Sequence, residues 1–554
     1  MNTAVFNHNK YRMVSPVNMP QRHWPEHVLT QAPVWCSVDL RDGNQALKEP
    51  LNQQQKLTYF KMLVQMGFKE IEVGFPSASD EDFNFVRTLI EEQYIPDDVT
   101  IAVLTPAREV LIKRTFRALE GISRALVHMY NSTSKVQREQ VFGLDKGGII
   151  NIAVNGAQAV RACAQKQPET DWRFQYSPES FTATELDFAV QICNAVNDVW
   201  QPEPDKPVVI NLPATVETSM PNVYADQVEW FIAHIHYRDS VIISVHTHND
   251  RGCAVAAAEL ALLAGAQRVE GTLLGNGERT GNVDLITMAM NLYSQGIDPE
   301  LHLSEIQSVS ERISHLIQMA IHPRHPYIGE LVYTAFSGSH QDAINKCLKN
   351  YQSGQIWEVA YLPIDPADLG RSYEEVIRIN SQSGKGGVAW IIEQSLGTQI
   401  PRWLQTEFSQ LVQRQAEKTG SEISSEWIVD LFVNTYMQPK GLFQIYRYQA
   451  GQVSEEEEQT EFVIQHLDKR LKLYAQGVGI LNCFISALSA QFTVAMDIIE
   501  YSEQTLQPDS SARAIAFVRV AVHGQNYTGV AENEDIVMAS LNAILQAVSE
   551  YILS

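Results

Sequence analysis

Cysteine is scarce in this chain, and the six cysteines that are present are scattered along it. They stand at positions 36, 163, 193, 253, 347 and 483, and no two of them form a Cys-x-x-Cys pair. This distribution excludes a disulfide framework and is typical of a reducing compartment. The sequence also has no apolar run approaching the ~18–20 residues that cross a membrane, and its N-terminus lacks the apolar core of a signal peptide. We therefore predict a cytoplasmic protein with no membrane partner.

Basic residues are outnumbered as well, with 42 Lys and Arg against 65 Asp and Glu and a formal net charge of -23. This balance argues against nucleic acid or an anionic membrane as the main partner. It leaves room for a small anionic substrate, which needs only a local cluster of basic groups. With 554 residues, of which 45% are hydrophobic, the chain is a globular protein too long for a single core, so two or three domains are expected.

Short apolar runs alternate with longer amphipathic stretches from about residue 34 to residue 296. Eight such units over roughly 260 residues predict an α/β fold of the (β/α)8 TIM-barrel type. A doubly wound sheet is the alternative, but it usually has fewer strands and an early glycine-rich phosphate loop, which the first unit lacks. The expected strands cover residues 34–40, 70–76, 100–106, 124–131, 172–179, 207–217, 241–250 and 268–277.

The chain beyond the barrel is expected to form two further regions. Residues 300–430 have mostly helical patterns, and two similar halves follow near the C-terminus. The first half is interpreted as one strand, a glycine turn and a helix, and the second as two strands, a turn and a helix, which predicts a small α+β domain. The predicted parts are an N-terminal extension (1–30), the barrel (31–320), helical linker subdomains (321–435) and the C-terminal domain (436–554).

Ionisable residues cluster where the predicted strands end, which is the face that carries the active site in (β/α)8 barrels. His246 and His248 are two positions apart in a strand, so both face the barrel axis. With Asp42, from the strand 1 region beside them, they form a set that can hold a divalent metal ion. Arg41 can stabilise an oxygen that gains negative charge.

Three further residues at these strand ends have two interpretations each. His128 is either a site residue or a core histidine with both nitrogens satisfied. Glu179 is either a site carboxylate or a cap of the following helix. Thr215 is either a substrate contact or a hydroxyl bonded to the backbone.

Long motifs of the chain resemble those of the acyl-CoA-condensing barrel enzymes. "DLRDGNQ", "HTHNDRG" and "GNGERTGNVDL" are similar to signatures of isopropylmalate, homocitrate and citramalate synthases and of hydroxymethylglutaryl-CoA lyases. With "NLPATVE", "YSPESF", "HPYIGELVYTAFSGSHQDAI" and "YLPIDPADLGRSYEEVIRINSQSGKGG", nearly the whole chain resembles the 2-isopropylmalate synthases of the longer bacterial and fungal type.

The resemblance implies roles for residues on both sides of the site. Asp42, His246 and His248 match the metal ligands, and Asn282 matches an asparagine close to them. Arg41 matches the arginine that stabilises the developing alkoxide or enolate. The residues that match positions around the 2-oxo acid are His128, Thr215 and Glu179, of which Glu179 is also a candidate for acid–base catalysis. His340 and Tyr373 match catalytic residues near acetyl-CoA that the partner subunit of a dimer often contributes.

The activity implied is the condensation of acetyl-CoA with 3-methyl-2-oxobutanoate and water to give 2-isopropylmalate and CoA, the first committed step of leucine biosynthesis. The ligand set alone does not choose between Mg²⁺, Mn²⁺ and Zn²⁺. The resemblance favours Mg²⁺ or Mn²⁺, with K⁺ as an activator. It also implies a cytoplasmic homodimer.

A C-terminal regulatory domain that binds leucine as a feedback inhibitor is implied too. Its first glycine turn, Gly477-Val478-Gly479-Ile480, departs from the family pattern, so inhibition by leucine stays open. The alternatives are a homocitrate or citramalate synthase, a lyase of the same barrel and a non-catalytic leucine-binding paralogue. A lyase is not expected to carry the 325–387 segment, and the intact metal-ligand set argues against the paralogue.

Overall fold

The structure is a computed structural model that describes residues 10–11, 14–335, 337–371, 385–419, 424–452, 458–505 and 513–554. The chain divides into two compact units. The first comprises residues 1–332 with 368–371, and the second comprises residues 333–367 with 372–554. The division into four parts expected from the sequence stays a prediction.

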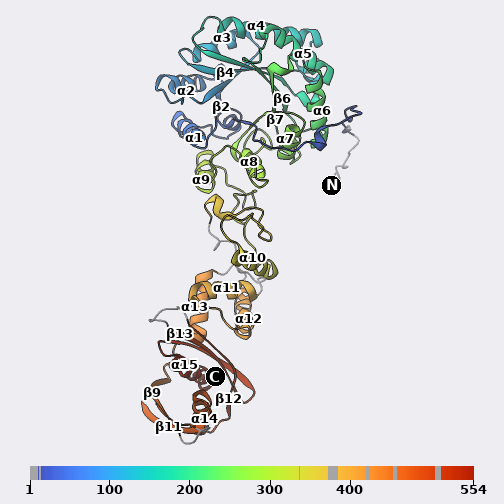
Figure 1. Ribbon diagram of the computed structural model, residues 1–554. Coiled ribbons are helices and arrows are strands. Elements are labelled where there is room, and N and C mark those ends of the chain that lie inside the picture. Colours follow the sequence, from blue (N-terminus) through green and yellow to red (C-terminus); the bar gives the residue numbers. More distant parts are fainter. Residues whose placement is uncertain are drawn as a thin grey trace, which may run out of the picture. The chain divides into compact units, whose positions relative to one another are not determined.

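The first unit is a closed barrel of eight parallel strands, which confirms the predicted fold (Figure 1). Closure is made by β1, which pairs with β2 on one side and with β8 on the other. The strands are almost entirely buried, and this explains why they read as short apolar runs rather than as alternating patterns. They are β1 (Val34–Ser37), β2 (Glu70–Gly74), β3 (Thr100–Pro106), β4 (Arg124–Ser132), β5 (Asp171–Glu179), β6 (Val208–Ala214), β7 (Val241–Thr247) and β8 (Arg268–Gly271).

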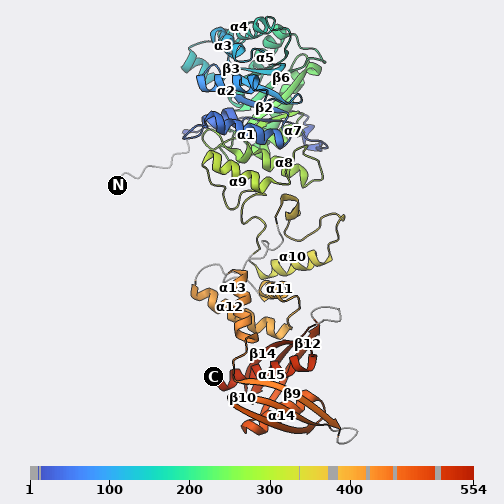
Figure 2. The same cartoon turned by 90° about the vertical axis from the view of Figure 1, so that its left-hand side faces the viewer.

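Helices follow the strands and form the outer layer of the barrel unit, as Figures 1 and 2 both show. Side-chain caps fix where several of them begin. Asn52 and Gln55 form a reciprocal capping box at α1, and Ser79 and Asp145 cap α2 and α4. The helices are α1 (Gln53–Gln65), α2 (Asp80–Glu91), α3 (Glu109–Ala118), α4 (Lys146–Ala164), α5 (Leu186–Trp200), α6 (Pro221–His234), α7 (Ala254–Leu263), α8 (Leu285–Tyr293) and α9 (Ile306–Ile317).

The first strand ends earlier than the sequence predicts. It stops at Ser37, and residues Asp39–Gly43 form a single π-helical turn that carries Arg41 and Asp42. The cause is Asp39, whose buried carboxylate accepts hydrogen bonds from Tyr59 Oη and from the backbone nitrogen of Leu273. These bonds draw the chain out of the strand. Asp42 therefore reaches the site from a turn and not from the strand itself.

The second unit begins with helices and ends with two three-stranded antiparallel sheets. The helices are α10 (Gly338–Asn350), α11 (Lys385–Leu396), α12 (Arg402–Thr419) and α13 (Ser425–Phe432). One sheet contains β9 (Phe443–Gln452), β10 (Glu458–His466) and β11 (Lys469–Gly477), followed by α14 (Ile480–Phe492). The other contains β12 (Met496–Thr505), β13 (Ala514–Val522) and β14 (Gln525–Asn533), followed by α15 (Ile536–Leu553).

The internal repeat therefore consists of two copies of a unit with three strands and one helix. The expectation of one strand before the first glycine turn is wrong, because β10 and β11 form a hairpin that reverses at Leu467 and Asp468. Leu467 adopts a left-handed conformation (φ 52°), and the turn contains no glycine or proline to mark it in the sequence. The expected two strands, turn and helix of the second half correspond to β13, β14 and α15.

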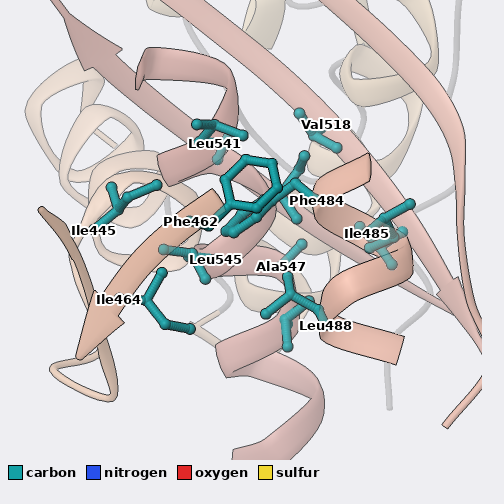
Figure 3. Packing of buried hydrophobic residues seen from close by; sticks show 14 of the residues in the cluster. Ile445, Phe462, Ile464, Phe484, Ile485, Leu488, Val518, Leu541, Leu545 and Ala547 are labelled. Carbon is teal, nitrogen blue, oxygen red and sulfur yellow. The ribbon is translucent and has the colours of Figure 1, made fainter. Parts of the chain in front are cut away.

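Apolar packing fills the space between these sheets and helices. Phe462 on β10 and Phe484 on α14 lie at the centre (Figure 3), with ring centroids 4.6 Å apart. Leu488 and Leu545 join them from α14 and α15. A second apolar cluster joins α11, α12 and α13 to β13 and β14.

One helix departs from the expectation that no apolar run reaches membrane-spanning length. α15 has 18 residues with a mean hydropathy of 1.5. Half of it is buried, and Leu541 and Ala547 belong to the apolar core shown in Figure 3. Its composition is that of a central helix in a folded domain.

Candidate metal and substrate site

A cavity of about 360 Å³ opens among the βα loops that follow the barrel strands. Its volume lies in the range of small-molecule sites. Most of the residues that the sequence predicts for the site line it, namely Arg41, Asp42, His128, Glu179, Thr215, His246 and His248. The other lining residues are Gln45, Phe75, Leu104, Tyr130, Ser177, Asn211, Pro213, Glu278 and Arg279.

Asp42, His246 and His248 form a compact set of metal-binding donors at one wall of this cavity. Their ligand atoms lie within 4.8 Å of one another, and all three residues are buried. The Nε2 atoms of both histidines are 3.8 Å from Asp42 Oδ2, and the two imidazole rings are stacked with centroids 5.2 Å apart. One carboxylate and two imidazoles on a common point fit a divalent cation that keeps open positions for a substrate.

Asn282 lies between two of these donors. Its Oδ1 is 2.7 Å from His246 Nε2, and its Nδ2 donates to Asp42 Oδ2 at 2.7 Å. The glycines of "GNGERTGN" permit this approach, because a Cβ on Gly277 would lie 2.0 Å from Asn282 Nδ2. Gly281 (φ 95°) likewise lets the loop pass over Gly275.

Electrostatics keep two of the three donors deprotonated near neutral pH. Burial raises the pKa of Asp42, but the charge of Arg41 and the neighbouring histidines outweigh burial and lower that pKa to about 2. Burial and the nearby His246 lower the pKa of His248 to about 4. Burial also acts against the charged form of His246, but its hydrogen bond to Glu270 and the charge of Asp42 raise its pKa above the usual value.

Arg41 and His128 are joined through a carboxylate on β2. Glu72 accepts from Arg41 Nε at 2.5 Å and lies 2.6 Å from His128 Nδ1, while Arg41 also donates to Asp42 Oδ1 at 2.8 Å. Burial raises the pKa of Glu72, but the charge of Arg41 lowers it below the usual value. The guanidinium of Arg41 is therefore fixed beside the metal-ligand set by two carboxylates.

The same chain of hydrogen bonds continues around the cavity and closes on itself. His128 Nε2 is 2.7 Å from Ser177 Oγ, which accepts from Asn211 Nδ2 at 3.0 Å. Asn211 Nδ2 also donates to Glu270 Oε2 at 3.2 Å, and the same oxygen lies 3.0 Å from His246 Nδ1. Asp42 and His246 thus belong to one ring of hydrogen bonds with His128, Ser177 and Asn211, which closes through Asn282.

Glu72 and Glu270 are site residues that the sequence reasoning missed. Both lie inside buried strands, in "EIEVG" and "RVEG", and both are 1% exposed. A carboxylate in a continuous apolar run is costly unless it is paired. That cost is the signal that could have identified them.

Glu179 and Thr215 lie at the rim of the cavity. Glu179 accepts a hydrogen bond from Ser132 Oγ on the neighbouring strand. The hydroxyl of Thr215 accepts from the backbone nitrogen of Ser180 at 2.9 Å, while its carbonyl oxygen accepts from Arg279. Thr215 therefore has the backbone bond that the alternative interpretation expects, and it also faces the cavity. His128 similarly has both ring nitrogens satisfied and still lines it.

Of the two residues expected near acetyl-CoA, His340 lies among the described residues. His340 lies on α10 of the second unit, where its ring stacks on Tyr361 with centroids 3.9 Å apart. Tyr373 lies outside the described residues. Their predicted roles stay predictions.

Three family profiles match successive parts of the chain. The HMGL-like profile matches residues 32–313, the profile of the alpha-isopropylmalate synthase post-catalytic domain-like family matches 330–393, and that of the LeuA allosteric (dimerisation) domain matches 422–552.

Similar proteins cover almost the whole chain. It is 53% identical to a 2-isopropylmalate synthase of Alcanivorax borkumensis, over 98% of this chain and 97% of that protein. It is 52% identical to a 2-isopropylmalate synthase of Rhodospirillum rubrum, over 97% of this chain and 98% of that protein. A protein of Pseudomonas entomophila with the same name is 50% identical over 98% and 96%.

Proposed function

The chain belongs to the 2-isopropylmalate synthase family, and we propose that it condenses acetyl-CoA with 3-methyl-2-oxobutanoate and water to give 2-isopropylmalate and CoA. The observation that carries this proposal is the convergence of Asp42, His246 and His248 on one wall of the cavity at the active face of the barrel. The residues around that wall supply the other groups that the reaction needs.

Asp42, His246 and His248 would hold the divalent cation, with Asn282 beside them. When bound, Mg²⁺ or Mn²⁺ supplies Lewis-acid polarisation of the keto group. We favour these ions over Zn²⁺ because the family resemblance implies them, with K⁺ as an activator.

Arg41 is the cation of this chain that stabilises the alkoxide formed from the keto oxygen. Glu72 and Asp42 hold its guanidinium before the substrate arrives, so little reorganisation is needed as charge develops. His128 and Thr215 bind the 2-oxo acid. Glu179, at the rim, is a candidate for moving a proton.

The acetyl-CoA side needs a base that removes a proton from the acetyl methyl group as the thioester enolate forms. We assign this step to His340 and a further catalytic role to Tyr373, on the strength of the motifs "SGSHQD" and "GRSYEE". Water then hydrolyses the thioester, which makes the reaction irreversible.

The C-terminal domain is proposed to dimerise the protein and to bind leucine as a feedback inhibitor. The match of residues 422–552 to the LeuA allosteric (dimerisation) domain supports this role. A homodimer would also allow one subunit to complete the acetyl-CoA side of the other.

The test is the release of free CoA from acetyl-CoA with a panel of 2-oxo acids, with and without EDTA. We expect a preference for 3-methyl-2-oxobutanoate and loss of activity in EDTA that Mg²⁺ or Mn²⁺ restores. A preference for 2-oxoglutarate or pyruvate would assign the chain to a sister reaction. Addition of leucine to the same assay tests feedback inhibition.

A further inference from the structure

Glu270 connects the metal-ligand set to the interior of the barrel through both of its carboxylate oxygens. Oε2 accepts from His246 Nδ1 at 3.0 Å and from Asn211 Nδ2 at 3.2 Å, so this oxygen faces the site. Oε1 accepts from Gln175 Nε2 at 2.5 Å and from Arg268 Nη1 at 2.6 Å, so the other oxygen faces the barrel interior. Each carboxylate oxygen therefore accepts two hydrogen bonds, and the two pairs of donors lie on opposite sides of the carboxylate.

Arg268 anchors this carboxylate. Its side chain is 1% exposed, and it donates to Ser244 Oγ at 2.8 Å and to Glu70 Oε2 at 2.6 Å in addition to Glu270. Glu70 and Glu270 thus share the same buried guanidinium. They differ in what lies on their other side, because Glu70 faces Arg173, at 3.7 Å, whereas Glu270 faces His246 and Asn211.

We propose that Glu270 is the positioning residue that aims His246 at the metal ion and holds Asn211, on the cavity floor, at a fixed place relative to it. The proposal rests on the proposed metal-dependent function. By accepting from Nδ1, the carboxylate selects the imidazole orientation in which Nε2 faces Asp42. Carboxylates that orient ligating histidines in this way contribute about 10–100-fold to metal affinity.

An amide cannot replace this carboxylate. In Glu270→Gln, one end of the side chain becomes an NH₂ group that donates and does not accept. If the NH₂ group faces the site, it meets the donors of His246 and Asn211. If it faces the barrel interior, it meets the donors of Arg268 and Gln175. Either orientation loses the hydrogen bond from a donor that an amide flip cannot replace, His246 on the site side or Arg268 on the interior side, although the volume of the side chain is unchanged.

Glu70→Gln is the matched control. It also replaces one of the two carboxylates of Arg268 by an amide in a buried strand of the barrel. A loss of stability that comes from the buried guanidinium should therefore appear in both variants. A loss of metal binding that comes from the orientation of His246 should appear only in Glu270→Gln.

The experiment measures the dissociation constant for Mn²⁺ of the full chain by electron paramagnetic resonance, together with the melting temperature. We expect the constant to rise about 10–100-fold in Glu270→Gln and to stay at the wild-type value in Glu70→Gln. At saturating Mn²⁺, Glu270→Gln should also raise KM for 3-methyl-2-oxobutanoate more than it lowers kcat, because Asn211 loses its acceptor.

Equal effects of the two variants on Mn²⁺ binding would overturn the proposal. If Glu270→Gln does not fold, Glu270→Asp takes its place, because it keeps the charge beside Arg268 but shortens the reach to His246 by one methylene. Weaker Mn²⁺ binding in that variant supports the proposal, and wild-type binding overturns it. Failure of the proposed function gives a different result. In that case the wild-type chain either does not bind Mn²⁺ or binds it in a way that the substitution Asp42→Asn leaves unchanged.

Discussion

The interiors of the two units of the molecule differ in the kind of side chain that they bury. All the buried Asp, Glu, Lys and Arg residues that the structure describes lie in the barrel unit, among them Glu70, Glu72 and Arg268. The main core of the second unit, by contrast, consists of apolar side chains around Phe462 and Phe484 (Figure 3). Buried charges cost free energy unless they are paired, and packed apolar groups do not carry that cost.

The proposed function accounts for this difference. Under it, the free-energy cost of burying Glu72 and Glu270 is offset by their contacts with Arg41 and His246, which belong to the proposed metal and substrate site. The core of the C-terminal domain is held by apolar packing, and the proposed regulatory role of this domain places no catalytic group there. Damage to the barrel interior should therefore affect both stability and metal binding, whereas damage to the C-terminal core should lower stability and leave metal binding unchanged.

The largest expected effect is on catalysis by the barrel. Asp42→Asn removes the charged donor of the metal-ligand set, and activity should fall by about 10³-fold or more, in line with the several kcal/mol that a Lewis acid contributes. The measurement is CoA release at saturating substrates. Glu461→Gln, a partly exposed position on β10, is the control from the other unit and should keep wild-type activity. Near-normal activity of Asp42→Asn would contradict the proposed catalytic role of the metal site.

Arg268→Met should destabilise the barrel by about 3–5 kcal/mol, because it leaves two buried carboxylates without their shared cation. Urea unfolding followed by hydrogen exchange separates the two units. Protection should fall in the barrel strands and persist in β9–β14. A uniform loss over both units would show that the two interiors are not independent.

Leu488→Ala tests the apolar side of the comparison. Leu488 is fully buried in the C-terminal core, so the truncation should cost about 2–5 kcal/mol there through lost burial and a cavity. The dissociation constant for Mn²⁺ should not change. Weaker Mn²⁺ binding in this variant would contradict the assignment of the metal site to the barrel alone.

The smallest predicted effect concerns pH. Asp42, with a pKa of about 2, and His248, with a pKa of about 4, are already deprotonated at neutral pH. Burial disfavours the charged form of His246, but Glu270 and Asp42 raise its pKa, so a metal ion that binds below this pKa must displace a proton. Mn²⁺ affinity should rise about tenfold per pH unit below that pKa and level off above it. A titration that shows constant Mn²⁺ affinity from about pH 6 to about pH 9 would contradict the predicted rise of affinity with pH.

The sequence predicts the fold well and the site in part. The eight barrel strands are recognisable because parallel strands buried on both faces leave continuous apolar runs. The ends of the strands are less predictable, since Asp39 draws the chain into a turn through a contact with Leu273, more than two hundred residues away. Such a contact leaves no local signal.

The same reason explains which site residues were found. Asp42, His246 and His248 follow from their motifs and from the strand period, and they do line the cavity. Glu72 and Glu270 stand alone in apolar runs, and only the closed barrel brings them beside Arg41 and His246. Tyr373, outside the described residues, and His340, in the second unit, keep the roles that the motifs predict for them.

The central claim is that one divalent cation binds between Asp42, His246 and His248. Anomalous diffraction from crystals grown with Mn²⁺ tests it most directly. The account predicts an anomalous peak within coordination distance of Asp42 Oδ2 and of the Nε2 atoms of both histidines, about 2.0–2.3 Å. A peak elsewhere in the barrel, or none at this wall of the cavity at saturating Mn²⁺, would contradict it.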